Sequence, residues 1–139
     1  DARRLGADRI VLSTDDDQMA AVAGTFHLIV DTVPYAHDLN PYIPTLAFKG
    51  QLVLVGYLGP LEPALNSMPM VLGGKAVAGS LIGGIPATQE MLDFCGEHGI
   101  VSDVEVIDMQ NINEAYERML KSDVKYRFVI DMASLKSEA

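Results

Sequence analysis

The chain has 139 residues, of which 49% are hydrophobic and 21% charged, a composition typical of one folded globular domain. Its 19 acidic and 10 basic residues give a net charge of −9, which argues against nucleic acid and anionic membrane surfaces as partners. No apolar run approaches the roughly 20 residues of a membrane span, and the single cysteine, Cys95, cannot form an internal disulfide. We therefore expect a cytoplasmic protein.

Three segments near the start predict a strand, a helix and a second strand. The apolar run Arg9–Ser13 predicts a short buried strand. The carboxylates of Asp15–Asp17 suit the positive end of a helix over residues 18–24; a metal site, the alternative, needs ligands spread around a loop. Phe26–Val33 is apolar throughout its centre, which predicts a strand covered on both faces.

The next segments complete a strand–helix–strand unit. A helix is predicted over Leu39–Phe48, although Pro41 and Pro44 disturb its first turns. Gln51–Gly56 is typical of a second buried strand, and it ends in glycine. Such units are parallel and right-handed, so the two strands are expected to end at the same edge of a sheet.

The second half continues the alternation of helices and strands. Helices are predicted over Met68–Leu72, Thr88–His98 and Asn113–Lys121, and strands over Lys75–Ile82, Val101–Val106 and Lys125–Met132. Thr88 is the expected cap of its helix, and Gly99 is the expected stop. The alternation indicates an α/β fold with a mostly parallel sheet.

The glycine-rich turn Gly79–Pro86, GSLIGGIP, follows a predicted strand and precedes a predicted helix. Gly83 and Gly84 have no Cβ, so a flat ligand can approach the main chain there. In an open α/β sheet the ligand crevice lies at the carboxyl ends of the strands. The turn is therefore either the floor of a cofactor site or a plain connection. The chain holds no G-x-G-x-x-G motif, so we expect a partial Rossmann-like sheet that lacks its first two strands.

Several motifs closely resemble the C-terminal half of zinc-dependent medium-chain alcohol dehydrogenases of the cinnamyl alcohol dehydrogenase type. The most specific are GSLIGGIP at Gly79–Pro86, TQEMLDFCGEHGI at Thr88–Ile100, INEAYERML at Ile112–Leu120 and DVKYRFVID at Asp123–Asp131. Others that fall in family order are LGAD at Leu5–Asp8, DTV at Asp31–Val33 and LVG at Leu54–Gly56. The resemblance covers essentially the whole chain.

The resemblance implies a fragment of an oxidoreductase that interconverts alcohols and aldehydes with NADP(H) and carries zinc. The family's zinc ligands and its glycine-rich phosphate turn lie upstream of the matched part, so we expect no catalytic residue and no metal ligand here. One cysteine cannot supply either zinc site. The chain alone is expected to be inactive and to bind NADP weakly or not at all.

The resemblance also implies which residues contact the cofactor. They are Thr32, Val33, Pro34, Val55, Gly56, Tyr57, Ser80, Leu81, Ile82 and Arg127. The first three are expected to line the ribose and nicotinamide side, and the next six to reach the nicotinamide and its carboxamide, mainly through the backbone. Tyr57 departs from the small aliphatic residue of the family. Arg127 matches an arginine that contacts the cofactor phosphates, and a surface ion pair is an equal alternative.

Two functional parts are expected along the chain. Residues 1–86 form a partial nucleotide-binding domain, and residues 87–139 form a helix–strand–helix–strand segment that returns to the catalytic domain. The family joins two subunits edge to edge near Lys75–Ser80, which implies a homodimer. Two alternatives stay open, a non-catalytic α/β module that associates with itself and a zinc-free quinone reductase relative.

Overall fold

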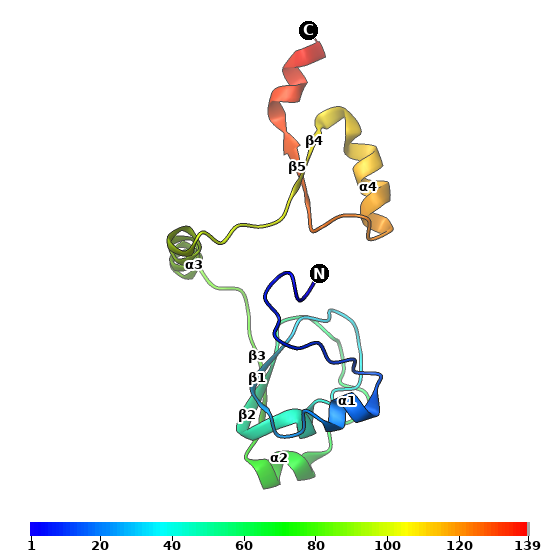
Figure 1. Ribbon diagram of the computed structural model, residues 1–139, viewed down its shortest axis with the longest axis vertical. Coiled ribbons are helices and arrows are strands. Elements are labelled where there is room, and N and C mark those ends of the chain that lie inside the picture. Colours follow the sequence, from blue (N-terminus) through cyan, green and yellow to red (C-terminus); the bar gives the residue numbers. More distant parts are fainter. Residues whose placement is uncertain (139) are drawn as a thin grey trace. The chain divides into compact units, whose positions relative to one another are not determined.

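The computed structural model describes residues 1–138 of the chain (Figure 1). The chain divides into two compact units, a first unit, Asp1–Ile82, and a second unit, Gly83–Ala139. Both contain parallel strands and helices, which confirms the predicted α/β class. None of the helices described is long and apolar enough to cross a membrane.

The first unit is built on a three-stranded parallel sheet (Figure 1). Its strands, in the order in which they lie side by side, are β1 (Phe26–Asp31), β2 (Leu46–Leu54) and β3 (Ala76–Gly79). Asp31 lies opposite Leu54, and Leu54 lies opposite Gly79. The three strands therefore end in one row, at the carboxyl edge of the sheet.

The predicted helix over residues 39–48 is wrong, and β2 begins at Leu46, within the predicted helical range. Pro41 and Pro44 have no backbone N–H to donate, so a regular helix cannot propagate through them. Only a short 3-10 helix forms, η1 (Ile43–Thr45). The chain passes from η1 directly into β2, so β1 and β2 are connected without an α-helix.

Apolar side chains cover one face of β2. Ile43, Leu46 and Leu52 pack together and are at most 1% exposed. Burial of one such side chain contributes about 1.5–3 kcal/mol, so this cluster fixes η1 against the sheet. Gly50 lets β2 lie close to β1, because an added Cβ would be 2.7 Å from the carbonyl oxygen of Phe26.

The beginning of the first unit differs from the prediction in two respects. Residues 9–13 form no strand, because a strand needs a backbone partner and none of the described strands pairs with this segment. β1 is not covered on both faces, since Leu28 and Val30 are 58% and 53% exposed. In addition, the helix predicted over residues 18–24 forms at Asp16–Ala20 instead, as α1, and Asp15 caps it.

The predicted helical segment before β3 is confirmed as α2 (Ser67–Gly73). Asn66 caps its start by accepting a hydrogen bond from the Met68 N–H at 3.1 Å. Gly74 ends it in the left-handed conformation, at a φ of 58°. Lys75 then donates from Nζ to the Ile43 carbonyl oxygen at 2.8 Å, which ties the start of β3 to η1.

The second unit contains two helices and a pair of parallel strands. Its elements are α3 (Ile85–His98), β4 (Glu105–Asp108), η2 (Met109–Asn111), α4 (Ile112–Leu120), β5 (Phe128–Asp131) and η3 (Met132–Glu138). β4 begins four residues later than predicted, because its pairing with β5 starts at Glu105 opposite Phe128. The two strands are joined by a connection that contains α4 (Figure 1).

The predicted cap of α3 is wrong, although the predicted end is confirmed. α3 begins at Ile85, with Gly84 as its cap residue and Pro86 in its first turn. Thr88 lies inside the helix and donates from Oγ1 to the Gly84 carbonyl oxygen at 3.1 Å. Gly99 ends α3 at a φ of 64°.

Candidate functional site

The row of strand ends continues past the strands themselves. The Val55 N–H donates to the Asp31 carbonyl oxygen at 3.1 Å, and the Ser80 N–H donates to the Leu54 carbonyl oxygen at 2.9 Å. The segments that follow β1, β2 and β3 therefore start side by side, at the edge where open α/β sheets bind ligands. We call residues 32–34, 55–57 and 80–82 the carboxyl-edge site. It contains every predicted cofactor residue except Arg127.

Gly56 is held directly against the segment that follows β1. A Cβ at this position would lie 3.0 Å from the Val33 carbonyl oxygen and 3.2 Å from the Pro34 Cα. Both distances are shorter than an ordinary van der Waals contact, and both neighbours are backbone atoms that move only with the chain. The absence of a side chain at Gly56 is therefore what lets these two segments of the site meet.

The third segment of the site is open to solvent. Leu81 and Ile82 are each 90% exposed, as is expected of apolar residues that lie where a ligand would cover them. The Ser80 N–H is engaged with Leu54, so it cannot donate to a ligand. The Ser80 carbonyl oxygen accepts no hydrogen bond from the part of the chain that the structure describes, so it remains available to a donor.

Asp31, at the end of β1, places a buried carboxylate beneath the site. Its Oδ1 accepts a hydrogen bond from the Val33 N–H at 2.9 Å. Its Oδ2 lies 3.0 Å from Nε2 of His37, yet the contact lacks hydrogen-bond geometry and no other described group bonds this oxygen. A cavity of about 190 Å³ adjoins the carboxylate, lined by Ile29, Val30, Asp31, Thr32, Val33, His37, Tyr42 and Leu52.

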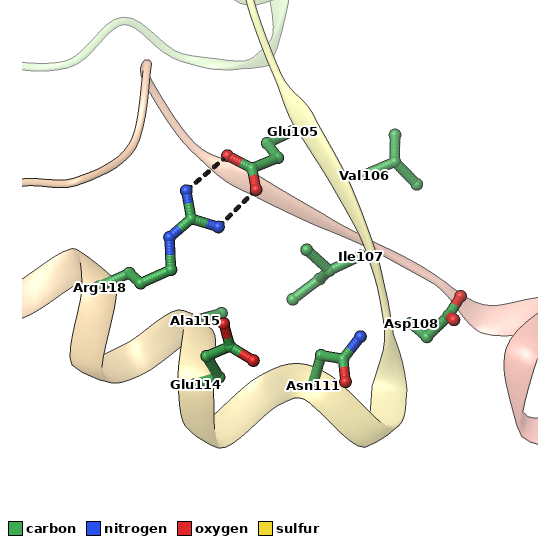
Figure 2. A pocket seen from close by; sticks show the side chains of 8 residues that line it. All are labelled: Glu105, Val106, Ile107, Asp108, Asn111, Glu114, Ala115 and Arg118. Carbon is green, nitrogen blue, oxygen red and sulfur yellow. Dashed lines mark hydrogen bonds and ion pairs between the residues drawn. The ribbon is translucent and has the colours of Figure 1, made fainter.

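A second cavity, of about 290 Å³, lies in the second unit between α4 and β4 (Figure 2). Figure 2 shows the guanidinium of Arg118, on α4, facing the carboxylate of Glu105, on β4, through two parallel contacts. Arg118 also donates from Nε to Oδ2 of Asp123 at 2.9 Å. Its guanidinium carbon lies 5.0 Å from the centre of the Phe128 ring.

These charges pair with one another within the second unit. The hydrogen bond from Arg118 lowers the pKa of Glu105 below its usual 4.5. The hydrogen bonds to Glu105 and then to Asp123 raise the pKa of the Arg118 guanidinium. A carboxylate whose charge is already paired is a poor general acid or base near neutral pH. We therefore assign this cluster a structural role, as the connection between α4 and β4.

Arg127 belongs to the second unit. Its backbone carbonyl oxygen accepts a hydrogen bond from the Glu105 N–H at 3.0 Å, which fixes the main chain at the start of the β4–β5 pair. Its side chain is exposed, and no ion pair to it is found among residues 1–135. The predicted contact of Arg127 with cofactor phosphates stays a prediction.

No three His, Cys, Asp or Glu side chains come together to hold a metal ion within the described residues. Asp15, the first of the three consecutive aspartates, instead accepts hydrogen bonds from the backbone and the side chain of Gln18, at 3.0 and 2.7 Å. Cys95 is partly buried, and its sulfur contacts the Met91 sulfur at 3.7 Å. The residues present do not fit a zinc site.

Sequence reasoning identified the three strand ends but missed the pairing of Asp31 with His37. The sequence shows a polar residue closing an apolar strand and a histidine six positions later. That spacing gives no helical or strand periodicity, so the contact depends on the path of the loop from 32 to 36. An aspartate that closes an apolar strand was the one signal that the sequence offered.

Residues 1–97 match the zinc-binding dehydrogenase family. The chain is 53% identical over 137 residues to a probable cinnamyl alcohol dehydrogenase of rice, covering 98% of this chain and 37% of that protein. It is 49% identical over 134 residues to the aldehyde reductase YahK of Escherichia coli, covering 96% and 38%. The chain thus spans little more than a third of the length of these curated relatives.

Solved structures give the same result. A cinnamyl alcohol dehydrogenase of Sorghum bicolor matches with a TM-score of 0.82 at 47% identity, covering 95% of this chain and 37% of that one. A cinnamyl alcohol dehydrogenase of Helicobacter pylori, solved in complex with NADP(H), matches with a TM-score of 0.60 at 40% identity. That match covers 77% of this chain and 31% of the other. The partial Rossmann-like fold is therefore confirmed.

Proposed function

This chain belongs to the zinc-binding dehydrogenase family, and from that premise we propose that it supplies the nicotinamide side of an NADP(H) site. The protein in which it acts is an oxidoreductase that interconverts alcohols and aldehydes. The observation that carries the proposal is the convergence of three parallel strand ends at one edge of the sheet, where Gly56 lets the segments that follow β1 and β2 meet. The printed names of the relatives, an aldehyde reductase and cinnamyl alcohol dehydrogenases, support the reaction class.

The residues present fit a nicotinamide cofactor. Leu81 and Ile82 are each 90% exposed at the edge of the site, and a flat ring can lie against such apolar side chains. The Ser80 carbonyl oxygen is available to accept from a donor such as a carboxamide NH₂. When bound, the cofactor supplies the hydride chemistry, and the protein supplies binding and orientation.

Each segment of the carboxyl-edge site has a distinct task in this proposal. Thr32, Val33 and Pro34 line the ribose, while the backbone from Val55 to Tyr57 faces the ring. Ser80 to Ile82 hold the carboxamide through main-chain groups and cover one face of the ring with exposed apolar side chains. Fixing the carboxamide selects which face of the ring is presented to a substrate, which is a positioning task rather than a chemical one.

The proposal assigns a role to Arg127 but none to zinc. The forked guanidinium of Arg127 suits a pyrophosphate, and its exposure among the described residues leaves it available for that contact. Zinc, which the family name implies, has no ligand set within the described residues. No step of the proposed reaction is therefore assigned to zinc on the residues of this chain.

The test is a titration of the isotopically labelled chain with NADPH, followed by ¹H–¹⁵N correlation spectra. We expect weak binding that shifts the amide signals of Thr32, Val55, Gly56 and Ser80. The amides of α2 serve as the internal control and should not move, because they lie outside the carboxyl-edge site. Shifts confined to other segments, or no shifts at millimolar NADPH, would contradict the proposal.

A second proposal concerns self-association through the outer edge of β3. β3 pairs only with β2 among the described strands, so its other edge carries unpaired backbone groups that can accept a strand from a second copy. Sedimentation velocity over a range of protein concentrations tests this homodimer. We expect a concentration-dependent dimer, and a monomer at every concentration would exclude it.

The predicted division into a nucleotide-binding part, residues 1–86, and a segment that returns to the catalytic domain, residues 87–139, also stays a prediction.

A further inference from the structure

The imidazole of His37 lies between two oxygen atoms. Its Nδ1 is 2.8 Å from the Tyr35 carbonyl oxygen, and its Nε2 is 3.0 Å from Oδ2 of Asp31. A carbonyl oxygen can only accept a hydrogen bond, so the Nδ1 contact requires a proton on Nδ1. In a neutral ring Nε2 would then carry a lone pair 3.0 Å from a carboxylate oxygen, which is repulsive.

Burial makes that repulsion matter. The side chain of Asp31 is 8% exposed, and its Oδ1 already accepts from the Val33 N–H. Oδ2 has no hydrogen-bond partner among the described residues, and an unpaired buried carboxylate oxygen is destabilising. Both contacts of the ring become favourable when Nε2 also carries a proton, because the charged ring then faces the carboxylate.

Among the described residues that line the cavity, no other charged side chain performs this task. Tyr42 is the remaining titratable side chain that lines the cavity, and its ring stands edge-on to His37 at a centroid distance of 6.1 Å. Lys75 extends its Nζ to the Ile43 carbonyl oxygen instead, at 2.8 Å. The Asp38 carboxylate accepts from the N–H and the side-chain amide of Asn40, each at 2.8 Å.

We propose that Asp31 and doubly protonated His37 are positioning residues that hold the loop of residues 32–36 in place. The pair joins the end of β1 to the far side of this loop, and Asp31 fixes Val33 at its beginning. Val33 and Pro34 are the residues against which Gly56 packs. The effect on cofactor affinity rests on the proposed function, but the protonation of the pair does not.

We expect cofactor affinity to fall as the pH rises. With the proton present, the loop is held, and the carboxyl-edge site keeps its shape. Loss of the proton as the pH rises leaves two acceptors facing each other, so the loop loosens and cofactor affinity falls.

The direct test is a pH titration of the chain by NMR that observes the ring nitrogens of histidine. We expect His37 to show two protonated nitrogens at the acid end, and the amide signals of residues 32–36 to move along the same titration curve as its ring. His27 is exposed and serves as the control, because its titration should leave those amides unchanged. A singly protonated His37 ring throughout, or loop amides that do not follow it, would overturn the proposal.

A variant separates this proposal from the proposed function. The side-chain amide of His37→Gln can still donate to Asp31, yet it does not titrate. We expect NADPH affinity of the wild type to fall roughly tenfold as the pH rises, as for loss of one close charge pair worth about 1.4 kcal/mol, and affinity of the variant to stay level by comparison. Protonation of the NADPH phosphates changes affinity equally for both proteins, so it does not affect the difference between them. If NADPH does not bind at all, the proposed function fails, and the NMR titration of the His37 ring still tests the pairing with Asp31. If the NADPH affinities of the two proteins depend on pH in the same way, the proposed role of the pair is contradicted.

Discussion

The two units of this chain hold similar parallel strands together in different ways. In the first unit, Ile43, Leu46 and Leu52 are at most 1% exposed and seal one face of β2. In the second unit, Ala115 is the one buried apolar residue among those described, and Arg118 links α4 to β4 through Glu105. Apolar burial therefore holds the sheet of the first unit together, whereas an exposed ion pair helps to hold α4 against β4 in the second unit.

This difference has a functional consequence. The proposed cofactor site is formed by backbone atoms at strand ends, and such atoms keep their places only where the strands beneath them are fixed. The buried cluster under β2 gives the carboxyl edge that rigidity. The cavity in the second unit has paired charges and few buried contacts, so it lacks the same basis for a preorganised site.

The largest expected effect is from a change in the buried cluster. Leu52→Ala removes a side chain that is 1% exposed and leaves a cavity under β2. We expect the free energy of unfolding of the first unit to fall by about 2–5 kcal/mol, measured by urea unfolding. Leu72→Ala is the control, since Leu72 is 77% exposed on α2. Equal losses in the two variants would show that the cluster is not the core of this unit.

A smaller effect is expected at the close approach of two backbone segments. In Gly56→Ala the new Cβ meets the Val33 carbonyl oxygen at 3.0 Å, so the carboxyl-edge site must open. We expect a loss of about 1–3 kcal/mol in unfolding free energy, as for other overpacked sites, together with weaker NADPH binding in a fluorescence titration.

Gly79→Ala is the matched control for that prediction. Gly79 ends β3, and an added Cβ there would meet no atom within 4 Å. We expect stability and NADPH binding close to those of the wild type. If both alanine variants behave alike, the contact of Gly56 with Val33 and Pro34 is not what shapes the site.

A modest effect is expected at the cap of α1. The hydrogen bonds from the backbone and then the side chain of Gln18 lower the pKa of Asp15, so the folded state favours its carboxylate. Asp15→Ala should therefore shorten α1, seen as Cα chemical shifts of residues 16–20 moving toward coil values. Asp17→Ala keeps the cap and should leave these shifts nearly unchanged. A helix that persists without Asp15 would show that the cap is dispensable.

The smallest effect is expected at the exposed ion pair in the second unit. Because the pKa of Glu105 is lowered in the folded state, its stabilising contribution is present above its ordinary pKa of 4.5 and is lost as the pH falls below that value. Glu105→Gln should remove that acid dependence and part of the salt dependence of unfolding. Glu117→Gln, on the exposed side of α4, is the control. An unchanged acid limb in Glu105→Gln would contradict the assignment.

The sequence predicted the features that depend on local chemistry. The strand β1, the end of α3 at Gly99 and the row of three strand ends were predicted correctly. The failures depend on tertiary partners. Residues 9–13 have strand character without a strand to pair with, and Leu46 contributes to a strand because it is buried against Ile43 and Leu52. Helical periodicity over residues 39–48 could not reveal that contact.

The candidate site shows the same division. Resemblance and strand order placed residues 32–34, 55–57 and 80–82 correctly at one edge, since parallel strands of one sheet must end together. The contact of His37 with Asp31 could not be predicted, because it depends on how an irregular loop folds back on its own strand. The engagement of the Ser80 N–H with Leu54 was missed for the same reason, as it is set by the stagger of β3 against β2.

The central claim is that this chain supplies the nicotinamide side of the cofactor site. Saturation-transfer difference NMR with NADPH tests it most directly, because the ligand's own protons report which end of the molecule touches the protein. We predict that the nicotinamide ring protons receive more saturation than the adenine protons, and that Gly56→Ala weakens the transfer while Gly79→Ala does not. Stronger saturation of the adenine protons, or no transfer to either ring, would contradict the account.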